Sequence, residues 1–232
     1  MWVLMLALVM QGLPGGSLAA EMHGASTTVV INEVAWSGTT ASSSDEWLEL
    51  YNAGAAAVDL AGWTLRDGGD INLTLHGTLP AGGFFLLERT DDTTVNDIPA
   101  DLIYTGSLGN SGETLTLRNA SDQVVDTANG DGGAWPGGSA APGYLSMERI
   151  DAWAPDSDGN WASNDGITRN GHAANGDPIN GTPRQPNSAS QPPPTPSPTP
   201  SFTPATPPTV TSTPPATPTP TPTPSASPTR PA

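Results

Sequence analysis

The stretch that decides the fold is Glu46-Trp47-Leu48-Glu49-Leu50-Tyr51-Asn52. Leu48 and Leu50 alternate with Trp47 and Glu49, so the two leucines fall on one face of an extended strand. A period of two is typical of a sheet that buries one face and turns the other to solvent. We therefore expect the leucines in a core and the intervening side chains outside it.

Short segments of this kind recur through the middle of the chain and are divided by clusters of Gly, Asn, Asp and Ser. They lie at residues 28–36, 46–52, 57–66, 71–76, 83–89, 102–104, 113–118, 123–127 and 144–150. No window of twelve or more residues has the 3.6-residue period of an amphipathic helix. Many short strands without long crossovers predict an all-β fold, an antiparallel β-sandwich.

The composition restricts the partners of the chain. Its 232 residues include 23 Asp and Glu but only seven Arg and no Lys, which gives a formal net charge of −16. Phosphate neutralisation on nucleic acid requires clustered Lys and Arg, and so does docking on an anionic membrane. We expect neither. Because cysteine is absent, the chain has no disulfide, thiolate nucleophile or cysteine metal site.

Both ends of the chain differ in composition from the middle. Residues 1–20 contain the apolar run Trp2–Met10, then Gly and Pro, then small residues, which predicts a secretory signal peptide. The run is too short to span a bilayer. Residues 188–232 are dominated by Pro and Thr, which predicts a disordered, extended linker. We therefore expect a secreted, extracellular protein with no membrane insertion after signal removal.

Six motifs in the middle of the chain carry a family resemblance. They are VVINEV at 29–34, DEWLELYN at 45–52, VDLAGWTL at 58–65, LPAGG at 79–83, LGNSGETLTL at 108–117 and SMER at 146–149. In this order and spacing the chain resembles the lamin-tail domain, an immunoglobulin-like β-sandwich that is also found in secreted bacterial proteins. The resemblance covers residues 27–150, and residues 151–187 then form an Asp/Asn/Gly-rich extension of the domain.

The resemblance implies a fold and an accessory role, and it carries no catalytic residues to transfer. Independently, only His23, His76 and His172 are available as bases, and no nucleophile motif accompanies them. Glu46 as acid and Glu33 as base form the one carboxylate pair worth weighing for a hydrolase. The alternative, which we favour, is that these carboxylates are solvated or hold backbone N–H groups of loops.

An oxygen-rich loop is the one place where a cofactor is conceivable. Asp156, Asp158 and Asn160 occupy alternate positions around a glycine, and carboxylate and amide oxygens are the ligands that Ca²⁺ prefers. The pattern lacks the length and terminal glutamate of an EF-hand, and Asx-rich turns also occur without metal. The sequence thus predicts no cofactor other than a hypothetical calcium ion at this loop.

Tryptophan is the last signal. Trp135, Trp153 and Trp161 lie in loop-like sequence, where exposed indoles stack on sugars or anchor proteins. The alternative is that they cover the ends of the sandwich. We expect a non-catalytic accessory module that binds or displays an extracellular protein or glycan, with the Pro/Thr linker as its spacer. The alternatives are a secreted metal-dependent hydrolase and a fragment of a larger multidomain hydrolase.

Overall fold

The structure is a computed structural model that describes residues 29–190. The predicted signal peptide and all but the first three residues of the predicted linker lie outside this range. The strands are β1 (Val29–Ala35), β2 (Trp47–Asn52), β3 (Val58–Asp59), β4 (Thr64–Arg66), β5 (Asn72–Thr74), β6 (Thr78–Leu79), β7 (Phe84–Arg89), β8 (Leu102–Tyr104), β9 (Leu115–Arg118), β10 (Val124–Ala128), β11 (Met147–Arg149) and β12 (Trp161–Ser163), with one 3-10 turn at Asp158–Asn160. In this part of the chain, no helix has the length and apolar character needed to cross a membrane.

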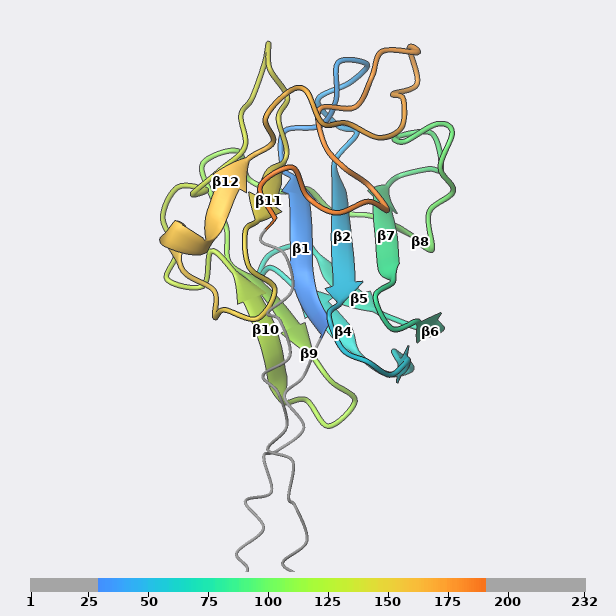
Figure 1. The fold of residues 1–232 in the computed structure, drawn as a ribbon, viewed down its shortest axis with the longest axis vertical. Coiled ribbons are helices and arrows are strands. Elements are labelled where there is room, and N and C mark those ends of the chain that lie inside the picture. Colours follow the sequence, from blue (N-terminus) through green and yellow to red (C-terminus); the bar gives the residue numbers. More distant parts are fainter. Residues whose placement is uncertain (1–28, 191–232) are drawn as a thin grey trace, which may run out of the picture. The chain divides into compact units, whose positions relative to one another are not determined.

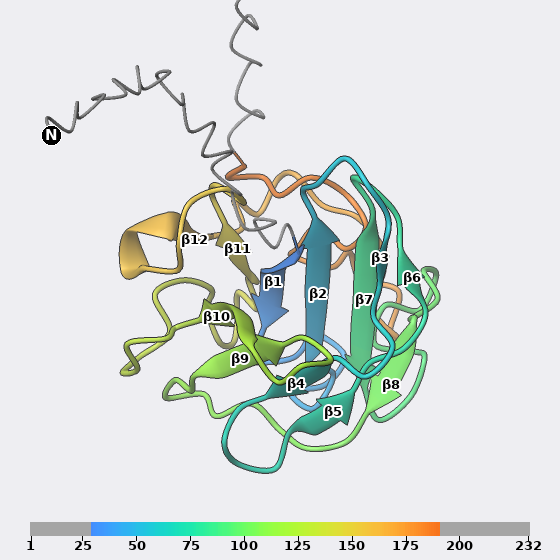
Figure 2. The ribbon, with the colours of Figure 1, turned by 90° about the horizontal axis from the view of Figure 1, so that it is seen from below.

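Two sheets face each other, and the predicted all-β sandwich is confirmed. The larger sheet has the strand order β12-β11-β1-β2-β7-β8, and the smaller one has the order β10-β9-β4-β5. β3 and β6 form a separate pair. Figure 2 shows the smaller sheet packed across one face of β1, β2 and β7. The core between the sheets includes Leu48, Leu50, Leu115 and Leu117, each fully buried, as the alternating pattern predicts.

One charged side chain joins the two sheets through this core. Arg149 of β11 is buried, and its Nη2 donates to the carboxylate of Asp126 in β10 at 2.6 Å. The Arg149 Nε donates to the carbonyl of Ile31 at 2.7 Å, and the guanidinium lies 4.5 Å from the ring centre of Trp161. The cation is therefore fixed by strands of both sheets and by an aromatic face.

The other face of the larger sheet is covered as well. Residues 164–190 cross β1 and β2 on the side away from the smaller sheet, where Figure 1 shows them as the orange segment. Ala173 and Ile179 of this segment pack with Trp47 and Leu86 in a second apolar cluster. We call residues 164–190 the cover.

The cover changes the outcome for β2. Trp47 is 1 % exposed and Glu49 is 0 % exposed, so the expectation that they face solvent is wrong. The alternating pattern predicts which residues share a face, but it does not show whether a later segment of the chain covers the second face.

A β-bulge in β1 determines which polar side chains lie under the cover. The pairing with β2 shifts between Ile31 and Glu33, so Asn32 is the extra residue. As a result both Asn32 and Glu33 are buried on the covered side, where they hydrogen-bond to residues of the cover. A regular strand would have sent one of the two into the core between the sheets.

Three further elements differ from the expected strands. β6 and β12 were not expected, and β8 pairs with β7 in parallel although all the other pairs are antiparallel. The parallel pairing is possible because residues 90–101 form a connection that is long enough for the chain to run back before β8 begins beside β7. The Asp101 carboxylate fastens the end of that connection by accepting the Leu86 amide at 2.8 Å.

Candidate functional site

Three glutamates stand side by side beneath the cover. Glu33 of β1 is paired in register with Glu148 of β11 on one side and with Glu49 of β2 on the other. All three are 0 % exposed. For Glu33 the structure supports the expectation that the carboxylate holds a loop. Glu33 accepts the backbone N–H of Thr182 at 2.8 Å.

The donors to this cluster are neutral groups. Ser146 donates its hydroxyl to Glu33 Oε1 at 2.6 Å. Asn32 donates to Glu49 Oε1 at 3.1 Å, and the Arg184 backbone amide donates to Glu49 Oε2 at 2.5 Å. Glu148 is held by further donors at both oxygens: Asn164 Nδ2 at 2.7 Å, Ser188 Oγ at 2.5 Å and the Ala189 amide at 3.1 Å.

The burial of these acids changes their protonation. Burial, and after it the charge of Glu148, raises the pKa of Glu33 from its usual 4.5 to about 8. Burial, and after it the charge of Glu33, raises the pKa of Glu49 well above its usual value. A raised carboxyl pKa is common to structural networks and catalytic acids. Here the cover lies over the carboxyls and separates them from solvent. We therefore assign the raised pKa values to a structural network.

Glu46, the other member of the weighed catalytic pair, lies in a different environment. Its Oε1 accepts from Arg89 Nη1 at 3.0 Å and its Oε2 accepts from the Leu108 amide at 2.7 Å. Burial raises its pKa to about 7. Glu33 and Glu46 share no hydrogen-bond partner, and each holds a separate loop, so the structure does not bring them together over a common opening.

The loop proposed for calcium is closed by contacts within the protein. Asp156 Oδ2 accepts from Thr127 Oγ1 and from the Gly130 amide, each at 2.7 Å, and its Oδ1 accepts from Trp161 Nε1 at 2.7 Å. Asn160 Oδ1 accepts from the Asp151 amide at 2.9 Å. Asp158 is exposed in the 3-10 turn.

Residues 29–190 contain no group of three or more His, Asp or Glu side chains placed to hold a metal ion. Calcium binding by Asp156, Asp158 and Asn160 stays a prediction. A melting curve with calcium and with chelator tests it, and an unchanged midpoint would remove it.

The three indoles of the predicted contact patch lie in different environments. Trp135 is 9 % exposed, stacks on Trp36 and donates to the Gly109 carbonyl at 2.8 Å. Trp161 is 4 % exposed and lies against Arg149. Only Trp153, which is 49 % exposed, offers a free ring among these three. Ligand binding at the patch stays a prediction, and it now depends on Trp153 alone.

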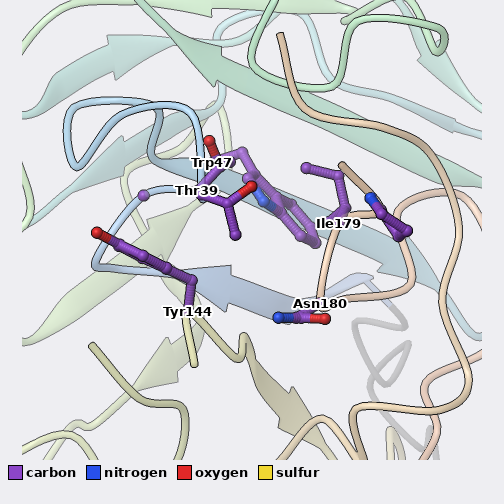
Figure 3. Close-up of a pocket in the computed structure, with 8 residues that line it drawn as sticks. Thr39, Trp47, Tyr144, Ile179 and Asn180 are labelled. Carbon is purple, nitrogen blue, oxygen red and sulfur yellow. The ribbon is translucent and has the colours of Figure 1, made fainter. Parts of the chain in front are cut away.

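A small cavity lies under the cover. A cavity of about 10 Å³ lies between the cover and the loop after β1, and Figure 3 shows Thr39, Trp47, Tyr144, Ile179 and Asn180 around it. This volume is about that of one water molecule. The cavity therefore belongs to the packing of the cover and is too small for an organic ligand.

A larger, open groove lies where the two sheets end. Its volume is about 450 Å³, and it is lined by β5 with Thr74 and His76 on one side and by Asp101 and β8 on the other. β5 and β8 are the outermost strands of their sheets within the described range. Residues just outside these two strands are also joined, since Ser107 after β8 donates its amide to the Asp70 carboxylate before β5 at 3.2 Å. Edge strands of this kind expose backbone groups that a further strand can pair with.

Sequence reasoning did not find either feature. The groove depends on which strands end each sheet, and the glutamate cluster depends on register and on the path of the cover. One signal was available for part of the cluster, because Glu49 lies between two leucines of a predicted strand. A glutamate between apolar residues is compatible with a buried sheet face and with an exposed one. This signal therefore did not show that the face is buried.

The comparison with known families agrees with this architecture. Residues 23–130 match the Lamin Tail Domain family. This part of the chain is similar to a lamin tail domain. The suspected resemblance is thereby confirmed over most of the range proposed from the motifs. No curated protein matches the chain.

The match ends before the last part of the folded unit. β11, β12 and the cover all follow residue 130, yet β11 pairs directly with β1. This domain is thus completed by residues 131–190, which supply one end of the larger sheet and seal the glutamate cluster. The 151–187 extension belongs to the same folded unit through the pairing of β12 with β11.

Proposed function

We propose that the chain is a non-catalytic binding module, displayed outside the cell on its Pro/Thr-rich spacer, and that it captures an extended segment of a partner protein. The observation that carries the proposal is the groove between the free edges of β5 and β8. A segment of three or four residues would match the length of β8. Its backbone would extend a sheet, as in other cases of strand addition.

The lining of the groove suggests the chemistry of the partner. Ile103 is 42 % exposed on β8, which favours an apolar side chain opposite it. The Asp101 carboxylate, beside Arg184, lines the groove, and the Asp70 carboxylate lies just before β5, in a chain with a net charge of −16. Charge complementarity therefore favours a segment that carries Lys or Arg next to an apolar residue.

The disposition of the carboxylates supports a non-catalytic role. Glu33, Glu49 and Glu148 are sealed beneath the cover, and Glu46 holds Arg89 and the Leu108 amide. A general acid or base must reach the substrate proton, directly or through one water. An assay of the purified protein for hydrolase activity, with and without divalent metal, tests the hydrolase alternative, and turnover would contradict our proposal.

A selection from random extended peptides tests the binding site. The full chain is immobilised and challenged with a displayed library of 12-residue peptides, and we expect enrichment of sequences with alternating apolar and basic residues. Ile103→Glu should weaken the selected peptides at least tenfold, whereas Ile167→Glu, at a residue that is 85 % exposed in the cover, should not. Equal binding of the selected peptides by both variants would contradict the proposal that they bind in the groove.

A glycan array, run on the unchanged chain and on Trp153→Ala, separates the other partner class. Binding to glycans that depends on Trp153 would replace the peptide proposal, because Trp153 is not among the residues that line the groove.

A further inference from the structure

We propose that the cover is fastened to the sheet by a single carboxyl proton, relayed from Glu33 through the hydroxyl of Thr182 to Glu148, and that the cover is therefore held more tightly in acid than in mildly alkaline solution. The proposal concerns the cover and does not depend on the binding function of the groove.

The contacts of Thr182 point to this proton. Thr182 Oγ1 lies 3.0 Å from Glu33 Oε2, 3.1 Å from Glu148 Oε1 and 3.5 Å from Asn187 Oδ1, so the two carboxylates are its nearer partners. A hydroxyl has one hydrogen, so it can donate to only one of the two carboxylates. For both contacts to be hydrogen bonds, the other carboxyl must donate to the hydroxyl oxygen.

The remaining contacts indicate which carboxyl carries the proton. Glu148 Oε1 already accepts from Asn164 Nδ2, and Glu148 Oε2 accepts from Ser188 and Ala189. Glu33 Oε1 accepts from Ser146 and from the Thr182 amide, whereas the contact of Glu33 Oε2 is the Thr182 hydroxyl. Glu33 Oε2 is therefore the position with room for a hydrogen. The relay runs from Glu33 Oε2–H to Thr182 Oγ1 and from Thr182 Oγ1–H to Glu148 Oε1.

The acids on the neighbouring strands favour the protonated form of Glu33, whereas Arg184 of the cover lowers the pKa of Glu49. Glu148 faces Glu33 from β11, and Glu49 faces it from β2. The cover contributes Arg184, but its guanidinium is directed to the Pro99 carbonyl at 2.9 Å and to Asp101 at 2.8 Å. Three buried acids on neighbouring strands thus have little positive charge to offset them, and a proton on one of them relieves the repulsion.

The direction of the pH effect follows from proton linkage. When the cover is closed, the pKa of Glu33 is about 8. When the cover opens, solvent reaches this carboxyl and its pKa returns to the usual value near 4.5. The closed form binds the proton more tightly, so the open fraction rises with pH between these two values. The Glu33 proton contributes a rise of about tenfold per pH unit, and this contribution levels off above the higher pKa.

Amide hydrogen exchange of the full chain, followed by mass spectrometry between pH 5 and pH 9, tests the proposal. After division by the intrinsic exchange rates, protection of the cover amides should fall at least about tenfold per pH unit between pH 5 and pH 8. Glu33→Gln should make this slope clearly shallower, because its amide N–H still donates to Thr182 and has no proton to lose. The slope that remains belongs to Glu49, whose pKa is also raised under the cover. The amides of β9 serve as the internal control in both proteins.

A second pair of variants tests the relay without changing a charge. Thr182→Val removes the hydroxyl but keeps the backbone amide that donates to Glu33, so the cover should lose at least tenfold in protection at pH 6. Thr182→Ser keeps the hydroxyl and should retain the protection and the slope of the unchanged chain. Equal slopes in the unchanged chain and Glu33→Gln, or full protection in Thr182→Val, would overturn the proposal.

Discussion

The carboxylate of Asp126 in β10 lies 2.6 Å from the guanidinium of Arg149 in β11, and the two strands belong to different sheets. The same carboxylate accepts the Ile31 amide at 2.8 Å, so it also holds β1. Opposing sheets in a sandwich usually meet through apolar side chains. In this protein an ion pair crosses the core at one end and fixes how the sheets lie against each other.

Loss of the cation should be severe. We expect Arg149→Met to lower the free energy of unfolding by about 3–5 kcal/mol, because it leaves the Asp126 carboxylate buried without its partner. Urea denaturation measures this loss. Arg149→Met combined with Asp126→Asn should cost clearly less than the sum of the single changes. Additive losses would show that the two residues act independently.

The close approach of the cover depends on a glycine. A Cβ at Gly181 would lie 2.6 Å from the Trp47 ring and 2.7 Å from Glu33 Oε1. Gly181→Ala should therefore push the cover away from the sheet and destabilise the fold by about 1–3 kcal/mol. Gly159→Ala is the matched control, since nothing lies within 4 Å of its added Cβ. Similar melting temperatures for the two variants would contradict the close packing.

Replacement of Trp161 and of Trp153 by alanine should affect stability differently. Trp161 is buried and lies against Arg149, so Trp161→Ala should cost about 3–5 kcal/mol of stability. Trp153 is 49 % exposed, so Trp153→Ala should leave the melting temperature within experimental error. Thermal melts of both variants check this, and a large loss in Trp153→Ala would mean that its ring contributes to the core.

Glu88 predicts a further dependence of stability on pH. Burial raises its pKa from the usual 4.5 to about 7, so the folded chain holds this proton more tightly than the unfolded chain. The stabilisation is complete below pH 4.5, falls as the pH rises to 7 and changes no further above it. Urea midpoints across this range should show a steeper decline for the unchanged chain than for Glu88→Gln. Parallel curves would assign the decline to other groups.

Alternation in the sequence was enough to locate most of the sandwich. Leu48, Leu50, Leu115 and Leu117 lie in the core between the sheets, where the period of two placed them. Trp63 is also buried there. These positions are determined locally, because neighbouring residues of a strand must point to opposite faces.

The features of the candidate sites depend on contacts that are distant in sequence. Glu33 meets Thr182 across 149 residues, and Asn32 meets Asn187 across 155. The cover has almost no regular secondary structure, so no periodicity indicated that it would lie on a sheet. The groove was out of reach for a similar reason, since it needs the order of strands in both sheets. For Trp135 and Trp161, the sequence left open whether the rings are exposed or cover the ends of the sandwich, and both rings are buried.

The pairing of β11 with β1 has a practical consequence for protein engineering. A fragment cut at residue 130, the end of the family match, would leave β1 as a bare sheet margin and Trp47 uncovered. Such a fragment would be expected to self-associate. Anyone who transplants this module into a fusion protein should keep the chain through residue 190.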